Sequence, residues 1–238
     1  MKHFIITRFG YPKDYEHLEE RIALFNSFTL PSIKAQTNQN FEWLLLGDQL
    51  FDIPGARWFG DQPVEAKEHL CPGHLNDSYL RYIKTVTKKE NLVLMTRLDN
   101  DDILMPTFVA DVQATAKLSG FKTPGLIDFR GYRLDISLTY GPRWQNKFYQ
   151  DILYHKEFTS PMVTLVQNKV RDTVYRRNHA MMARFFPVTF VEKPNWVQVV
   201  HGDNWLQATY QTRKWSKEVT TIHPFVKQLM EAHNAKSS

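Results

Sequence analysis

The chain has 238 residues, enough for one large domain or two small ones at roughly 100–200 residues per domain. Lys and Arg outnumber Asp and Glu by 30 to 25, and 42% of the residues are hydrophobic, which excludes disorder, a collagen-like repeat and a coiled coil. The single cysteine, Cys71, excludes an internal disulfide and a cysteine-rich metal site. Because the sequence shows neither a signal-peptide pattern nor a long apolar run, we expect a cytoplasmic protein. The formal charge of +5 favours an anionic partner, but no long basic block is present, so nucleic acid is not expected.

The first part of the chain is predicted to form a β–α–β unit. Residues 3–9 are a short apolar run typical of a buried strand, and an amphipathic helix follows it. We expect Pro31 to interrupt this helix, which would resume at Ser32 and end near Gln36. Residues 41–47 form the second predicted strand. Such units build parallel, doubly wound sheets.

The remaining elements alternate less regularly. Loops rather than regular helices are expected between the later strands, and the chain should be frayed from about Asn234. We predict one α/β domain with a mostly parallel sheet flanked by helices and a mixed C-terminal half. The further predicted elements are a strand at 57–59, a helix at 76–89, a strand at 91–98, a helix from Pro106 to about Gly120, and strands at about 125–134, 162–167, 188–191 and 197–201.

The strongest chemical signal is an acidic run after the predicted strand 91–98. Asp99, Asp101 and Asp102 lie within four residues, and such charges repel one another unless a cation shares them. Ligands of open α/β sheets bind at the carboxyl ends of the strands, where an Asp-x-Asp pair can hold a hard divalent cation. Arg97, beside the run, can pair with an acid or with a phosphate. The pattern predicts a site for a metal and a phosphate group.

Helix capping is the alternative role for these carboxylates. Asp101 or Asp102 would then cap the helix that opens near Pro106, with the other acids in solvent. Asp48 follows the second predicted strand and has two comparable roles open to it, capping a turn or binding the hydroxyl groups of a ligand.

A second candidate group follows the last predicted strand. His201 ends that strand, Gly202 permits a close approach, and Asp203 follows at once. As a metal ligand, His201 would shift the preference from Mg²⁺ toward Mn²⁺. His179, which follows Arg176-Arg177-Asn178, is a further candidate for ligand or catalytic duty.

Aromatic residues form 13% of the chain and concentrate in its second half. Core filling explains most of them, and some are candidates for a platform on which the C–H faces of a sugar stack. The residues concerned are Tyr132, Tyr140, Trp144, Phe148, Tyr149, Trp196 and Trp205.

Three segments together resemble one enzyme family. Residues 32–43 contain the pattern S-x-x-x-Q-T followed by N-F-E-W, residues 96–106 contain D-x-D-D followed by Pro, and residues 196–204 run from a Trp to H-G-x-N. This combination is similar to the family-2 inverting glycosyltransferases of the GT-A type, and most of all to their rhamnosyltransferase-like group. The resemblance covers most of residues 3–110 and, beyond them, only 196–205.

The resemblance implies a GT-A-like fold with a nucleotide-sugar-binding half over residues 1–110, an acceptor-binding half over 111–233 and a frayed tail over 234–238. It implies transfer of a sugar, with rhamnose as the candidate, from a UDP-, GDP- or dTDP-sugar to a glycan or glycolipid hydroxyl. A metal ion, Mn²⁺ or Mg²⁺, would assist the departing diphosphate. Peripheral attachment at the inner face of the membrane stays open.

The family pattern also assigns roles to residues. It places Asp101 on the metal, with Asp99 on the ribose or the metal and His201 on the metal or the diphosphate. Asp48 falls where the family has an aspartate on the nucleotide base. Because they end strands at the same sheet edge, Thr7, Arg8, Asp48, Arg97 and Asp99 are expected to line the nucleotide pocket.

The catalytic base is the point where the chain departs from the family. No Glu-Asp pair precedes a late helix, although the Asp of such a pair is the usual base. Asp203 is the first candidate for the role and His179 the second.

Rival functions from other classes are also consistent with part of the pattern. A sugar nucleotidyltransferase would share the sheet and the metal but should have a Gly-rich loop after its first strand, where this chain has only Gly10. A metal-dependent phosphatase or nuclease would need a second set of ligands. A non-catalytic carbohydrate-binding protein would explain the aromatic residues but not the acidic strand end.

Overall fold

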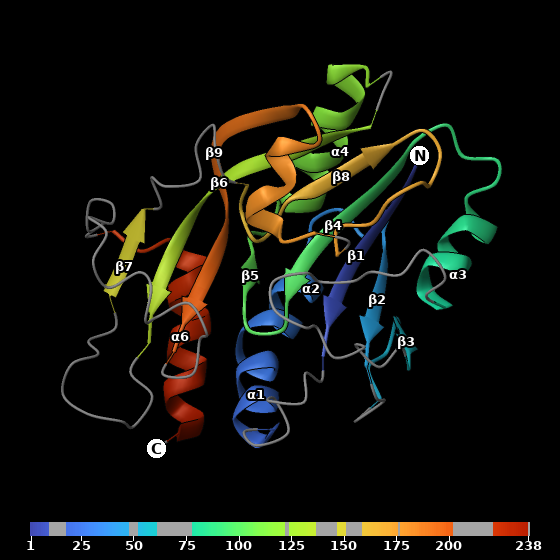
Figure 1. Cartoon of the computed structure of the whole chain (residues 1–238). Coiled ribbons are helices and arrows are strands. Elements are labelled where there is room, and N and C mark those ends of the chain that lie inside the picture. Colours follow the sequence, from blue (N-terminus) through green and yellow to red (C-terminus); the bar gives the residue numbers. More distant parts are fainter. Residues whose placement is uncertain are drawn as a thin grey trace.

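A computed structural model describes residues 1–9, 18–47, 52–60, 78–121, 124–136, 147–150, 159–175, 177–201 and 221–237. The chain folds around one mixed sheet with the strand order β3-β2-β1-β4-β8-β6-β9-β5, and β7 pairs with β6 (Figure 1). The α/β class predicted from the sequence is confirmed.

The N-terminal half of the sheet is parallel, as predicted. It consists of β1 (Lys2–Arg8), β2 (Glu42–Leu46), β3 (Ala56–Phe59) and β4 (Val93–Asp99). β1 lies between β2 and β4, and its apolar residues Phe4, Ile5 and Ile6 are fully buried. The register pairs Arg8 with Asp99 at the carboxyl end of the sheet.

The other half of the sheet is mixed. β8 (Thr164–Gln167) runs antiparallel to both β4 and β6 (Gly125–Asp135), and β9 (Val188–Val200) runs parallel to β6. Two short strands that the sequence analysis did not predict complete it, β5 (Ile103–Leu104) against β9 and β7 (Lys147–Gln150) against β6. As a result β1, β2, β3, β4, β6 and β9 all point their carboxyl ends to the same edge (Figure 1).

The prediction of two separate strands at 188–191 and 197–201 was wrong, because β9 is continuous. The register against β6 shifts near Arg130, where two residues of β9 are skipped before Pro194. Such a bulge accommodates a proline, which cannot donate to the ladder, without ending the strand.

The helix after β1 also continues through the predicted break at Pro31. It runs as α1 (Leu18–Leu24), a π-helical segment η2 (Phe25–Thr29) and α2 (Leu30–Lys34). The π segment shifts the hydrogen-bonding frame, and Pro31 then lies in the first turn of α2, where its missing N–H costs little.

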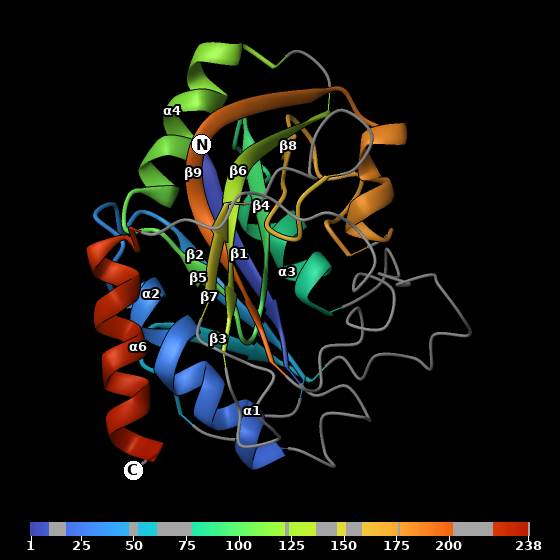
Figure 2. The same ribbon diagram turned by 90° about the vertical axis from the view of Figure 1, so that its left-hand side faces the viewer.

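Helices cover both faces of the sheet. Figure 2 shows α4 (Phe108–Ser119) and α6 (Pro224–Ser237) on the face where α2 lies, and α3 (Ser78–Val86) on the opposite face. The 3₁₀ helix η3 (His179–Arg184) packs on the α3 side through buried Met182. Between the later strands, the described residues contain this short 3₁₀ helix but no α-helix, and α6 follows the last strand.

The C-terminal segment is helical. α6 continues to Ser237, and its buried Val226 and Leu229 pack in the same apolar cluster as Phe28 of η2. The ring of His233 lies 5.0 Å from the Phe28 ring. These contacts supply the burial that the sequence pattern alone did not reveal.

The buried side chain of Gln36 ties the end of α2 to the start of α4. Its Nε2 donates to the Met105 carbonyl at 2.9 Å, and its Oε1 accepts from the Val109 N–H at 3.1 Å. Val109 is in the first turn of α4, whose N-cap residue, Thr107, makes no side-chain cap. Gln36 therefore supplies the cap from a segment far away in the sequence.

We expect Gln36→Ala to lower the free energy of unfolding by about 2–4 kcal/mol, because it leaves a buried carbonyl and a buried N–H without their partner. Denaturant unfolding measures this change. Gln228→Ala removes an exposed helical Gln and should stay within about 0.5 kcal/mol of the unaltered chain. A loss of similar size in both variants would contradict the assigned role of Gln36.

A buried histidine lies within β1. His3 is 1% exposed, and its Nε2 lies 2.8 Å from Thr96 Oγ1, which in turn contacts Thr164 Oγ1 at 2.7 Å. Burial lowers the pKa of His3 to about 3. The folded protein therefore resists protonation at a pH where the unfolded chain accepts a proton.

Acid should destabilise the fold through His3. Its folded pKa lies below the ordinary 6.5, so stability is lost as pH falls below 6.5, by about 1 kcal/mol between pH 7.0 and 5.5. The ring C–H resonances of His3 in NMR spectra should stay at their neutral positions down to pH 5, and should titrate normally when the protein is unfolded in urea. A folded-state transition near pH 6.5 would contradict this expectation.

Candidate functional site

Several of the predicted site residues that the structure describes gather at the carboxyl edge of the sheet. Arg8 and Asp99 end β1 and β4, and His201 follows the last residue of β9. In Figure 1 these strands point toward the end of the molecule where α1 lies. Parallel strands bring their carboxyl ends together, which is why distant segments meet here.

The first group of residues, the Tyr175 cluster, consists of Arg8, Arg97, Asp99 and Tyr175. The guanidinium groups of Arg8 and Arg97 each lie 5.3 Å from the centre of the Tyr175 ring. Arg97 also donates from Nε and Nη2 to the two carboxylate oxygens of Asp99, at 3.0 Å each. The Tyr175 hydroxyl is fixed by donation to the Ile6 carbonyl at 2.9 Å. The cluster therefore holds two cations beside one carboxylate at the strand ends.

The second group, the Asp101 cluster, consists of Arg21, Asp101 and His201. Arg21 Nη1 and His201 Nε2 both lie 2.9 Å from the same carboxylate oxygen, Asp101 Oδ2. Burial raises the pKa of Asp101, but the hydrogen bond from His201 and the charge of Arg21 outweigh it, so the pKa lies below its ordinary value. Asp101 is therefore an ionised carboxylate buried at the strand ends.

Asp102, the third acid of the run, faces the interior. Its Oδ1 accepts from the Val199 N–H of β9 at 2.8 Å. Burial, followed by the charges of Asp101 and Asp99, raises its pKa well above the ordinary value. Neither Asp101 nor Asp102 caps α4, so the capping alternative was wrong; Asp102 instead joins the acidic segment to β9.

His179, the second candidate for the base, begins η3. Its Nδ1 lies 3.3 Å from the Thr159 carbonyl. Burial, and then the nearby charge of Arg97, lowers its pKa to about 4. A base with that pKa is a poor proton acceptor at neutral pH, although a nearby Asp99 favours its protonation. Its assignment as base stays a prediction.

The remaining predicted residues differ in what the structure shows of them. Thr7 is fully buried, and its Oγ1 accepts from Trp43 Nε1 at 3.0 Å, so its side chain faces the core rather than the strand-end surface. Asp48 and Asp203 lie outside the described residues.

Gly47 ends the β2 segment with φ 133°, and a Cβ there would lie 1.7 Å from the Phe9 carbonyl oxygen. Only glycine allows the ends of β1 and β2 to approach so closely.

Of the seven aromatic residues predicted as a sugar platform, the structure describes the side chains of two, Trp196 and Tyr132. Trp196 is fully buried, donates from Nε1 to the Phe129 carbonyl at 2.7 Å, and occupies the space that a Cβ on Gly131 would need. It is a core residue, not part of a sugar platform. Tyr132 is partly buried, and the side chains of the other predicted platform residues lie outside the described residues.

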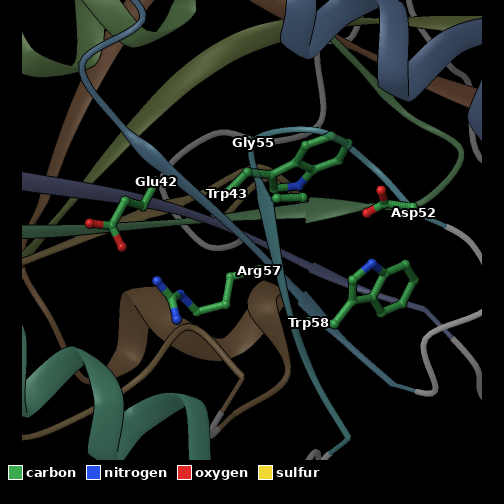
Figure 3. A pocket seen from close by; sticks show the side chains of 7 residues that line it. Glu42, Trp43, Asp52, Gly55, Arg57 and Trp58 are labelled. Atoms are coloured by element: carbon green, nitrogen blue, oxygen red, sulfur yellow. The ribbon is translucent and has the colours of Figure 1, made fainter.

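A hollow of about 470 Å³ lies away from both clusters, at the edge of the sheet formed by β2 and β3. Figure 3 shows Glu42 and Arg57 on one side of these strands, and the rings of Trp43 and Trp58 with Asp52 on the other. We place the candidate site at the strand ends instead, because paired charges from several strands and a helix converge there.

The residues of the Asp101 cluster fit a divalent cation. The carboxylate oxygen Asp101 Oδ2 suits Mn²⁺ or Mg²⁺, the imidazole nitrogen His201 Nε2 suits Mn²⁺ better than Mg²⁺, and the two atoms lie 2.9 Å apart. Across the described part of the chain, no three His, Cys, Asp or Glu side chains converge as a ready metal site. Two protein ligands are nevertheless typical where phosphate oxygens of a substrate complete the coordination.

Sequence reasoning missed two members of the site. Arg21 precedes its partner Asp101 by 80 positions, and Tyr175 lies 169 positions from Ile6. No motif marks either residue, since an arginine on an amphipathic helix and a tyrosine after a strand are common features. Only the fold shows that they belong to the site.

In the described part of the chain, none of the helices combines the length and the apolar character needed to cross a bilayer.

The comparisons with solved structures give low similarity. S. aureus TarS (residues 1–349) in complex with UDP-GlcNAc is 12% identical with a TM-score of 0.46, and matches over 86% of this chain and 60% of its own. The same protein in complex with UDP is 11% identical with a TM-score of 0.43, over 84% of this chain and 61% of its own. This chain thus spans less than two thirds of either TarS chain.

Sequence comparison gives the firmer result. None of the curated proteins matches this chain. A family model does match, over residues 8–213, and that span includes both clusters and all three segments on which the resemblance rests. The chain therefore belongs to the glycosyltransferase family described as "Putative rhamnosyl transferase".

Proposed function

We propose that this protein is a metal-dependent, inverting glycosyltransferase that moves rhamnose from a nucleoside-diphosphate sugar to a hydroxyl group of a glycan or glycolipid. The observation that carries the proposal is the Asp101–His201 pair at the carboxyl edge of the sheet, beside the arginines of the Tyr175 cluster. Family membership supports the class of reaction, and the name of the family supports the choice of sugar.

The two clusters suit the two demands of a diphosphate leaving group. The guanidinium groups of Arg8 and Arg97 lie at the strand ends, where their positive charge would attract the phosphate oxygens. Asp101 and His201 would hold a divalent ion, which neutralises charge that develops on the departing diphosphate. Arg8, Asp48, Arg97 and Asp99 remain our proposed surroundings for the nucleotide, without Thr7, whose side chain faces the core.

The transfer itself forms one bond and breaks one. The acceptor oxygen bonds to the anomeric carbon while the bond from that carbon to the diphosphate oxygen breaks, through an oxocarbenium-like state. The acceptor proton passes to a base on the acceptor side. Asp203 remains the first choice for that base and His179 the second.

Donor binding tests the proposal. Thermal unfolding should show stabilisation by at least one of the UDP-, GDP- and dTDP-sugars when Mn²⁺ is present, because a ligand that binds only the folded state raises its melting temperature. With a glycan acceptor, free nucleoside diphosphate should be released only when Mn²⁺ or Mg²⁺ is present. Full turnover in a chelator would sink the metal-dependent proposal.

Asp101→Asn should lower Mn²⁺ affinity in the presence of the nucleotide by about 100-fold or more, since it removes the charge of a proposed ligand. Isothermal titration measures this affinity. Glu231→Gln makes the same chemical change on the exposed side of α6 and should leave it unchanged. Equal affinity in both variants would show that Asp101 is not a ligand.

Tyr175 is expected to position the two arginines for the diphosphate. Tyr175→Phe retains the ring and should bind the nucleoside diphosphate of the best donor in the thermal screen within about twofold of the unaltered chain. Tyr175→Leu should weaken binding by about fivefold, the loss of roughly 1 kcal/mol of cation–π attraction. Calorimetry on variants with intact folds makes the comparison. Unchanged binding in Tyr175→Leu would exclude this role.

A further inference from the structure

Arg21, on α1, makes a largely buried contact with the residues at the strand ends. Its side chain is 16% exposed, and its partners Asp101 and His201 are 7% and 2% exposed. A pair this enclosed is little screened by water, unlike a surface ion pair. The guanidinium group thus neutralises a buried carboxylate.

We propose that Arg21 is an internal counter-cation that competes with the divalent ion for Asp101 and is released when a donor diphosphate binds. Metal binding and nucleotide binding would then be coupled through this one side chain. The inference rests on the proposed function, because it takes Asp101 and His201 as the residues that hold the metal. Neither the family pattern nor the sequence motifs assign a role to Arg21.

Competition follows from the geometry of the shared oxygen. Arg21 Nη1 and His201 Nε2 each lie 2.9 Å from Asp101 Oδ2, so two donors already occupy that acceptor. A divalent ion between Asp101 and His201 would lie beside the guanidinium group, and two cations repel strongly where burial keeps water out. The arginine must therefore move before the ion binds well.

A diphosphate offers Arg21 a new partner. Guanidinium groups form paired hydrogen bonds with phosphate oxygens, and the diphosphate brings more negative charge than the carboxylate that Arg21 leaves. Arg97 is less free to make this exchange, because both oxygens of Asp99 accept its N–H groups. By thermodynamic linkage, a nucleotide that frees Asp101 for the metal is itself bound more tightly when the metal is present.

Mn²⁺ binding to the protein without nucleotide tests the competition directly. The loss of the free Mn²⁺ signal in electron paramagnetic resonance gives the affinity. Arg21→Gln should bind Mn²⁺ about tenfold more tightly than the unaltered chain, a change typical of coupled sites. Arg81→Gln, which removes an exposed arginine from α3, should not change the affinity. Equal or weaker binding by Arg21→Gln would overturn the inference.

The same titration with nucleotide separates the two proposals. We expect the best of UDP, GDP and dTDP to strengthen Mn²⁺ binding more in the unaltered chain than in Arg21→Gln. If the nucleotide raises the Mn²⁺ affinity equally in the unaltered chain and in Arg21→Gln, the proposed role of Arg21 is wrong, whereas the proposed metal site is still supported. If Mn²⁺ binds neither protein, with or without nucleotide, the proposed metal site is wrong and this inference fails with it.

NMR of the unaltered chain keeps the inference testable if Arg21→Gln does not fold. The side-chain N–H resonances of Arg21 should shift when Mg²⁺ and the nucleotide are added together, because the hydrogen bond to Asp101 is exchanged for one to phosphate. Resonances of Arg81 should stay in place. An Arg21 signal that does not move under saturating Mg²⁺ and nucleotide would overturn the proposed release.

Discussion

The site depends on the hydrogen bonds between the helical segment 29–36 and residues 102–109, which begin with the last acid of the acidic run. Thr29 Oγ1 donates to the Asp102 carbonyl at 2.9 Å, and Ser32 Oγ accepts from the Leu104 N–H at 3.3 Å. Gln36 then bonds both to the chain before α4 and to its first turn. A row of buried polar contacts of this kind is costly to break, because each partner would lose its bond without gaining water.

This row fixes the acidic segment from one side, and β9 fixes it from the other. Asp102 Oδ1 accepts from the Val199 N–H, and the Met105 N–H donates to the Asn195 carbonyl at 3.0 Å. Because β9 ends beside His201, the same contacts that hold the segment set Asp101 opposite the imidazole. The S-x-x-x-Q-T pattern and the chain that follows the acidic pattern are thus held together by one set of buried hydrogen bonds.

The three acids of the run show how local surroundings separate similar side chains. Asp99 is paired with Arg97, Asp101 is ionised between Arg21 and His201, and Asp102 is buried against a backbone N–H with its pKa raised. Repulsion among adjacent carboxylates is relieved by sending each to a different partner. The result is one carboxylate that holds the Arg97 side chain, one that pairs with Arg21 and His201, and one that serves the fold.

The sequence by itself determined the parallel half of the sheet and the location of the acidic residues at its carboxyl edge. Continuous apolar runs such as Leu44-Leu45-Leu46 are compatible with strands covered on both faces, and such strands place the residues after them at one edge. Periodicity is a local property, so it failed where distant packing decided. The continuity of β9 past Pro194 depends on a bulge against β6, and the helix at 224–237 depends on contacts with Phe28. Only the tertiary structure decided that Arg21 and Tyr175 belong to the site, because ion pairs and ring contacts between segments many residues apart leave no spacing in the sequence.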